Sequence, residues 1–384
     1  MARVYVGLDI GSSCVKAVQL RRRGKELELE KYGVAEVNPG GPPPTGATAR
    51  EAKVRAIQTA LANGKITAKS AVSAVSGEPI IVRYIQLPDM PENELREALK
   101  WEAQEYVPFE LDEVNIDSTV LGKSEDGSMV NVLLVAAKKD LLSEHIGIIR
   151  QAKLQPEIID VDSFAFMNCF EANYAPMNEE AIALVNIGSN VTNINIFSHG
   201  VSLFSRDIAL AGDAITTAIQ TKLNKDWHEA EQLKLLEGAP EPAHDAAPAF
   251  DNMGGDDDNS SLLETIRGTV ERLTGESQKA ETPEELASKM IKTTLDNLLN
   301  EIRRSLQFFE NQANGRPVKQ LMLGGGASRM SNLTNYIQTE MKMQADVMDP
   351  LNRIRPSGKS IDLSALDSVR NMLGVSVGLA LRKV

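Results

Sequence analysis

The sequence predicts an α/β fold, because three glycine-rich segments each follow an apolar stretch with the composition of a β-strand. Two of these segments, 4–20 and 182–197, have the order strand, glycine turn, strand. The third, 320–337, is a strand that ends in three glycines before a helix. A lone glycine turn is usually only a turn, but two such hairpins followed by a strand–GGG–helix segment are hard to obtain by chance.

The first hairpin reads VYVGLDIGSSCVKAVQL and has the features of a phosphate-binding loop. The turn at Gly11, Ser12 and Ser13 points backbone N–H groups inward, and Gly11 allows close approach of the main chain. Lys16 adds a positive charge. Asp9 is placed to hold Mg²⁺ through water, which is how this ion is usually bound.

The second and third segments complete this pattern. In IALVNIGSNVTNINIF, Gly188 forms the turn, and Ser189 and Thr192 are expected hydroxyl donors. In QLMLGGGASRMSNLTNYI, the bare backbone of the triplet is expected to lie against a purine or ribose, and Ser328 is assigned to the same nucleotide site. The predicted triplet residues are Gly324, Gly325 and Gly326.

With these three segments the chain resembles the actin-like ATPase superfamily. Other segments resemble one family in it, PilM, the FtsA-related actin-like component of type IV pilus assembly. They are WEAQEYVPFELDEV, VLLVAAKKDLL, IIDVDSFAF, FSRDIALAGDAITTAI, HEAEQLK and VGLALR. The resemblance implies an actin-like fold of two ribonuclease H-like lobes with an FtsA-type inserted α+β subdomain. The expected parts are a first lobe (1–80 and 156–180), the inserted subdomain (81–155), a second-lobe core (181–212 and 316–384) and an outer subdomain (213–315).

The resemblance also assigns roles to individual residues. Asp162 falls where the superfamily usually has the glutamate that orients the attacking water, although a helix-capping role explains it equally well. Glu231 and Lys234, three apart on a predicted helix, correspond to a pair near ribose and adenine. A solvated helix face is the alternative for that pair. Gly212 corresponds to the second glycine of a Gly-Gly pair that here reads Ala211-Gly212.

Asn186 departs from the superfamily pattern. The second phosphate motif normally begins with an aspartate, whereas this chain has Asn-Ile-Gly. An asparagine accepts a hydrogen bond from metal-bound water, but it carries no charge and cannot act as a base. The residues therefore predict an ATP- and Mg²⁺-binding protein with weak or absent hydrolysis. An active ATPase switch and an FtsA-like filament protein remain the alternatives.

The family resemblance further implies a protein partner, the cytoplasmic N-terminal peptide of a PilN-like single-pass inner-membrane protein. Trp101, Tyr106 and Phe109 are candidates for this contact because aromatic residues favour recognition surfaces. A core role in the inserted subdomain explains them at least as well. Other pilus assembly components are expected partners, and self-association is left open.

Composition limits the remaining functions. The net charge of −12 argues against nucleic acid as the main partner, and two cysteines give no disulfide framework. The sequence shows neither a signal peptide nor a run of ~18 apolar residues, and it ends without an amphipathic tail. We therefore expect a cytoplasmic protein, peripheral to the inner membrane through partners. Residues 238–282 are rich in acidic residues, proline, alanine and glycine, which predicts a flexible insertion.

Overall fold

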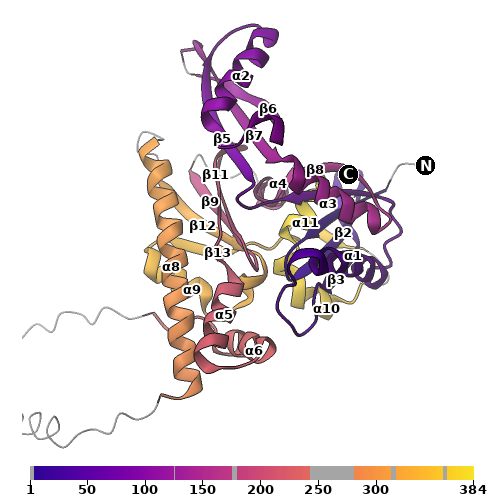
Figure 1. The fold of residues 1–384 in the computed structure, drawn as a ribbon, viewed down its shortest axis with the longest axis vertical. Helices are drawn as coiled ribbons and strands as arrows, with labels where there is room; N and C mark the ends of the chain where they lie inside the picture. The colour runs from indigo at the N-terminus through magenta and orange to yellow at the C-terminus, as the bar shows by residue number, and fades with distance from the viewer. Residues whose placement is uncertain (1–3, 125, 175–179, 243–280, 313–316, 358–360) are drawn as a thin grey trace, which may run out of the picture.

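The computed structural model describes residues 4–124, 126–174, 180–242, 281–312, 317–357 and 361–384 (Figure 1). Most of the expected insertion at 238–282 therefore lies outside the described residues. The described residues form three sheets, two of which make the lobes and one the inserted subdomain.

The first lobe contains a six-stranded sheet with the order β14-β3-β2-β1-β4-β8. Strands β3, β2 and β1 are antiparallel, whereas β1, β4 and β8 are parallel. Apolar residues on both faces of these strands are buried, because helices cover each face. The strands are β1 (Tyr5–Ile10), β2 (Cys14–Arg23), β3 (Glu26–Glu36), β4 (Ser70–Val75), β8 (Gln155–Val161) and β14 (Ile354–Pro356). The covering helices are α1 (Gly46–Asn63), α3 (Lys139–Gln151), α4 (Asp162–Tyr174) and α11 (Gly374–Leu381).

The second lobe repeats this topology in a five-stranded sheet with the order β11-β10-β9-β12-β13. Again three antiparallel strands are followed by two parallel ones. The strands are β9 (Ala181–Ile187), β10 (Thr192–Ser198), β11 (Val201–Ile208), β12 (Val318–Gly324) and β13 (Gln344–Val347). The helices are α5 (Gly212–Leu223), α6 (Trp227–Glu237), α8 (Pro283–Gln312) and α9 (Leu333–Met341), with the short 3₁₀ helix η2 (Gly326–Arg329). Helix α10 (Leu363–Val369), followed by η3 (Arg370–Met372), instead places Leu366 in one apolar cluster with residues of β2 and β3.

The long helix α8 packs against the second sheet along one apolar stripe. The buried residues recur at helical spacing, so that one face of the helix enters the core while the opposite face stays in water. The stripe consists of Ile291, Leu295, Leu298, Ile302, Leu306 and Phe309, all buried. The helix therefore has the core-packing role that the periodicity of the sequence predicts.

The inserted segment forms a three-stranded antiparallel sheet, order β5-β7-β6, with one helix packed on it. It projects beyond both lobes (Figure 1). Its elements are β5 (Ile80–Pro88), α2 (Glu92–Tyr106), η1 (Leu111–Glu113), β6 (Val114–Lys123) and β7 (Met129–Lys138). Helix α3 lies within the expected range 81–155, yet it packs on α1 of the first lobe. Similarly, β14 and α11 lie within 316–384 but contact the six-stranded sheet.

Helix α4 lies between the two sheets and joins them. Phe166 on this helix is 1% exposed and belongs to one apolar cluster with residues of β2, β9, β12 and α11. Because a Cβ at Gly324 would come within 2.5 Å of the Phe166 ring, only glycine fits at the end of β12. This packing brings the ends of β1, β9 and β12 to the same cleft.

Candidate nucleotide-binding site

Most of the residues predicted to bind nucleotide meet in one cleft of about 500 Å³ between the lobes. Both hairpin turns line it, one from each sheet, together with the loop that follows β12 and one face of α6. The predicted residues that line the cleft are Asp9, Gly11, Ser12, Ser13, Lys16, Asp162, Asn186, Gly188, Ser189, Gly212, Glu231, Lys234, Gly325 and Gly326. Thr192, Gly324 and Ser328 do not line it.

The first hairpin places a cation and a carboxylate side by side. Asp9 and Lys16 are cross-strand partners, and Lys16 Nζ lies 3.2 Å from Asp9 Oδ2. Burial lowers the pKa of the Lys16 ammonium, but Asp9 and neighbouring acidic groups outweigh this effect and raise the pKa. At Gly11 the N–H donates to Cys14 O at 3.1 Å, and a Cβ would lie 2.9 Å from that oxygen. The turn therefore requires glycine.

Asp162 is the first residue of α4 and lines the cleft. Its Oδ2 accepts a hydrogen bond from Ser76 Oγ at 2.6 Å. Burial, and next the charge of Asp9, raise the pKa of Asp162 to about 7, although Ser76 and Lys16 act in the opposite direction. A carboxyl group with this pKa exchanges a proton near neutral pH, which suits a general base beside a reacting group.

The second hairpin is tied to the start of α5. Gly188 N donates to Val191 O at 3.1 Å, and Gly212 N donates to Gly188 O at 3.1 Å. Ser189 Oγ donates to Asp213 Oδ2 at 2.6 Å. Thr192 is fully buried and donates to Leu210 O at 2.8 Å, so its hydroxyl holds the loop before α5 instead of facing the cleft.

The three glycines after β12 have different surroundings. Gly324 is buried against Phe166, and Gly325 has a φ of 87°, a conformation that favours glycine. Gly326 borders open space, since a Cβ there would meet no atom within 4 Å. Ser328 Oγ donates to Gly325 O at 2.7 Å and thereby closes the turn. Gly325 and Gly326 form the cleft wall, whereas Gly324 and Ser328 support it.

Lys234 and Glu231 form an ion pair with unequal exposure. Lys234 is 5% exposed, and its Nζ donates to Gly212 O, Thr216 Oγ1 and Glu231 Oε2 at 3.3, 2.9 and 2.6 Å. These bonds use all three ammonium protons. Glu231 Oε2 also accepts from Thr216 at 2.6 Å. The buried ammonium of Lys234 therefore orients Glu231, and the more exposed carboxylate of Glu231 is the group that faces the cleft.

The few acidic residues around Lys16 suit a metal ion whose ligands come mainly from water and from the phosphates of a bound nucleotide. No group of three or more His, Cys, Asp or Glu side chains in the described part of the chain could hold a metal ion. Mg²⁺ is commonly bound by one or two carboxylates, several waters and the substrate phosphates. Asp9, at the mouth of the first glycine turn, is a carboxylate of the kind that this mode of binding requires.

The sequence model of the type IV pilus assembly protein PilM family matches residues 7–246 and 251–384. The chain belongs to this family. A solved PilM–PilN type IV pilus biogenesis complex contains a chain that is 25% identical, with a TM-score of 0.76 over 99% of this chain and 98% of that one. The fold is therefore the actin-like α/β fold expected from the sequence.

More remote relatives were also found. The cell division protein FtsA of Rhizobium meliloti (strain 1021) is 24% identical over 179 residues, which are 45% of this chain and 35% of that protein. The chain thus matches about a third of the length of this curated relative. The ethanolamine utilization protein EutJ of Carboxydothermus hydrogenoformans is 11% identical, with a TM-score of 0.49 over 99% of this chain and 89% of that one. None of the described helices is long and apolar enough to span a membrane.

The three aromatic residues predicted to contact a partner of this PilM family member differ in exposure. Trp101 on α2 is 71% exposed and Tyr106 is 38% exposed. Phe109 instead packs against the core of the inserted subdomain, with Lys138 Nζ 4.2 Å from its ring centroid. Trp101 and Tyr106 are available at the surface, and Phe109 has a structural contact.

Sequence reasoning missed a polar group at the first-lobe end of the cleft. His145 and Lys53 both line the cleft, and His145 Nε2 lies 2.8 Å from Ser73 Oγ. Burial, and next the charge of Lys53, lower the pKa of His145 to about 4, so the imidazole is neutral at physiological pH. No local motif marks these residues, because they come from separate elements α1, β4 and α3.

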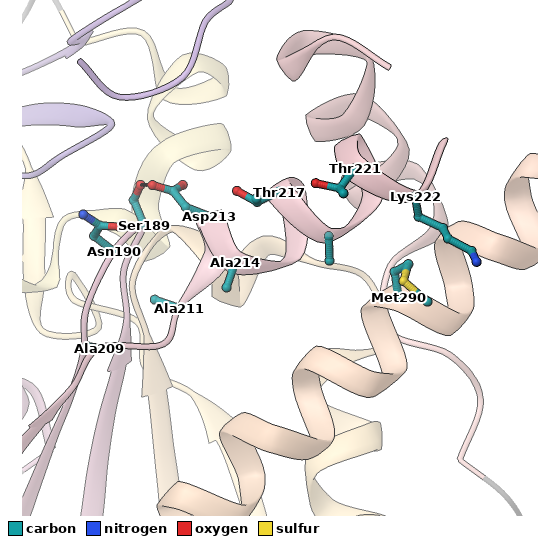
Figure 2. Close-up of a pocket in the computed structure, with 11 residues that line it drawn as sticks. Ser189, Asn190, Ala209, Ala211, Asp213, Ala214, Thr217, Thr221, Lys222 and Met290 are labelled. Atoms are coloured by element: carbon teal, nitrogen blue, oxygen red, sulfur yellow. Dashed lines mark hydrogen bonds between the residues drawn. The ribbon is translucent and has the colours of Figure 1, made fainter. Parts of the chain in front are cut away.

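A second pocket of about 750 Å³ lies along α5 and reaches α8 at Met290 (Figure 2). It shares Ser189, Asn190 and Asp213 with the cleft at one end, and Thr217, Thr221 and Lys222 line the other end. This pocket touches the second hairpin turn only at its edge and lacks the first turn and Lys16, so the two predicted glycine turns meet in the cleft and not in this pocket.

Proposed function

We propose that this PilM family member holds ATP and Mg²⁺ in the cleft between the lobes and acts as a scaffold of a type IV pilus or secretion assembly platform. The observation that carries the proposal is the convergence of two glycine hairpins, one from each sheet, on one cavity that also contains Lys16. Backbone N–H groups and a partly buried lysine together suit a polyphosphate.

Each part of the nucleotide has a matching group. The turns at Gly11 and Gly188 would receive the phosphates, with Lys16 supplying the positive charge. Glu231 would accept a hydrogen bond from the ribose, and the open space at Gly326 would admit the sugar and base. Asp9 would hold Mg²⁺ through water. The bound ion supplies charge neutralisation for the phosphates.

Slow or absent hydrolysis is the second part of the proposal. The position that usually carries the second aspartate has the amide of Asn186, which offers an acceptor oxygen but no charge. Phosphoryl transfer depends on positioning and on electrostatic stabilisation, so the loss of one carboxylate weakens turnover more than binding. Asp162, whose pKa is raised to about 7, is the group in the cleft that favours the alternative, an active ATPase switch.

The partner is proposed to be the N-terminal peptide of a PilN-like inner-membrane protein. Support comes from the similar chain in the solved PilM–PilN complex and from the exposed Trp101 and Tyr106. The protein would then be peripheral to the cytoplasmic face of the inner membrane through this partner. Contacts with other pilus assembly components and self-association belong to the same proposal.

The test is nucleotide analysis of the purified protein, followed by phosphate release with ATP and Mg²⁺. The protein is denatured, and any released nucleotide is identified by chromatography. Intact ATP with negligible phosphate release supports a nucleotide-holding scaffold. ADP with steady release from wild type, absent in a Lys16→Ala variant, replaces the scaffold with an ATPase switch.

A further inference from the structure

Three polar side chains form a row across the second sheet. Asn193 on β10 is the cross-strand partner of both Asn186 on β9 and Asp207 on β11. Asn186 Nδ2 donates to Asn193 Oδ1 at 2.9 Å, and Asn193 Nδ2 donates to Asp207 Oδ1 at 2.8 Å. Asp207 Oδ2 accepts from the Gly77 N–H of the first lobe at 2.6 Å. The row thus runs from the cleft to the other lobe.

The end of the row at Asp207 fixes the direction of every bond in it. A backbone N–H only donates, and the ionised carboxylate of Asp207 only accepts. Burial raises the pKa of Asp207, whereas the hydrogen bonds from Asn193 and from Gly77 N–H favour the ionised form. Asp207 therefore requires the NH₂ group of Asn193, whose oxygen is left to accept from Asn186. The oxygen of Asn186 is then turned away from the row, and it would lie 2.8 Å from a Cβ at Gly325 in the cleft wall.

We propose that Asp207 is a positioning residue for Asn186, acting through Asn193 so that the Asn186 amide keeps its acceptor oxygen toward the nucleotide cleft. Asn186 and Asp207 are accordingly a matched pair. A carboxylate at position 186 opposite Asp207 would place Asn193 between two acceptors, and one of them would face its carbonyl oxygen. The role of the oxygen rests on the proposed nucleotide function, whereas the matching of the pair does not.

Exchanging the two residues tests the pair. In the double variant Asn186→Asp/Asp207→Asn the bonds can re-form with the direction reversed, because the new amide at 207 donates to Asn193 and Asn193 donates to the new carboxylate at 186. We expect Asn186→Asp alone to lower the Tm by a few degrees. Adding Asp207→Asn should restore the Tm. Additive effects of the two substitutions would overturn the proposal.

Measuring ATP binding distinguishes a role of Asp207 in orienting Asn186 from a role in stability alone. Asp207→Asn alone also reverses the row and turns the NH₂ of Asn186 toward the cleft. We expect the Tm to change little, while the increase in ATP affinity caused by Mg²⁺ falls by about tenfold, because a donor replaces an acceptor. An unchanged Mg²⁺ effect in this variant, with ATP still bound, contradicts the positioning role.

Asn195→Asp is the matched control. Asn195 lies two residues along β10, is 1% exposed and donates to Ser202 Oγ at 2.8 Å, outside the row. The Asn195→Asp variant also gains a buried carboxylate, but adding Asp207→Asn should not restore its Tm. Rescue of both variants would mean that Asp207→Asn acts by lowering total negative charge, which contradicts the pairing. If wild type binds no ATP, the proposed function fails, and the Tm comparison still decides the pairing.

Discussion

Lys16 Nζ lies 3.2 Å from Asp9 Oδ2 across the first hairpin, with only 13% and 12% of the two side chains exposed. In a partly buried ion pair of this kind, the loss of hydration offsets much of the attraction between the two charges. Both charges lie at the mouth of a glycine turn. There Lys16 would face the phosphates of a magnesium–polyphosphate ligand, and Asp9 would face its Mg²⁺ ion.

Substitution of Lys16 by alanine should therefore weaken ATP binding. Loss of one charge-assisted contact is worth about 1.5–3 kcal/mol, so the dissociation constant should rise by roughly 10- to 100-fold. Isothermal titration with ATP and Mg²⁺ measures the effect. Lys25→Ala, in the exposed turn between β2 and β3, is the control and should bind as wild type. Equal losses in both variants would exclude a specific role for Lys16.

The raised pKa of Asp162 predicts a pH dependence of stability. The folded pKa of about 7 exceeds the ordinary value of 3.8, with burial the main cause and Asp9 the second. Between these values the folded protein retains the proton that the unfolded chain has lost. The contribution of Asp162 to the free energy of unfolding therefore decreases as pH rises from about 4 to about 7.

Asp162→Asn should remove this contribution and keep the acceptor for Ser76. Denaturant unfolding of both proteins at pH 5 and pH 7.5 is the measurement. Wild type should lose more stability than the variant over this range. The same loss in both proteins would show that Asp162 keeps an ordinary pKa.

The glycine triplet should respond differently at each position. Gly324→Ala forces a Cβ to 2.5 Å from the Phe166 ring, so it should cost about 1–3 kcal/mol of stability by overpacking. Gly326→Ala enters open space and should leave the Tm unchanged while weakening ATP binding. Thermal unfolding and ATP titration of the two variants give the comparison. A destabilised Gly326→Ala protein would contradict the described geometry of the turn.

Substitutions of Lys234 and Glu231 should have different effects, the first on stability and the second on ATP binding. Lys234→Met removes one hydrogen-bond donor from Gly212 O, Thr216 Oγ1 and the partly exposed Glu231 Oε2, and it should cost about 1–3 kcal/mol. Glu231→Gln, at the more exposed end of the pair, should fold normally and bind ATP less tightly. Chemical denaturation and titration distinguish the two effects. A stable Lys234→Met protein would mean that the ammonium is not needed to hold Glu231.

Trp101 offers a test of the partner surface. Because its side chain is 71% exposed, Trp101→Ala should leave the Tm unchanged and weaken the binding of a PilN-like N-terminal peptide by tenfold or more, about the effect of losing one hot-spot aromatic residue. Fluorescence anisotropy with labelled peptide measures the affinity. Phe308→Ala on α8, where the side chain is 53% exposed, is a matched control. If the Trp101 variant bound the peptide with unchanged affinity, the peptide would bind at another surface of the protein.

The glycine turns and α/β fold could be predicted from the sequence because each depends on a short local pattern. Gly11 and Gly188 mark hairpins that recur in both sheets, and the stripe on α8 follows helical periodicity. Their likeness to a known family then placed them in one actin-like fold, which the comparison with the PilM–PilN complex confirms.

Long-range contacts could not be predicted in this way. The link from Asn193 to Asp207 depends on strand register, and that from Gly77 to Asp207 depends on how the lobes meet. Thr192 looks like a phosphate-binding hydroxyl in sequence, but its direction is set by the loop at Leu210. The hydrogen bonds that occupy the Lys234 ammonium likewise form only when α6 packs against α5.

Equilibrium titration of nucleotide-free protein with ATP in the presence of Mg²⁺ decides whether the cleft holds a nucleotide. We expect one site per chain, lost or strongly weakened by Lys16→Ala and retained by Lys25→Ala. No saturable binding to wild-type protein that remains folded in the same buffer would contradict a nucleotide site between the two hairpins.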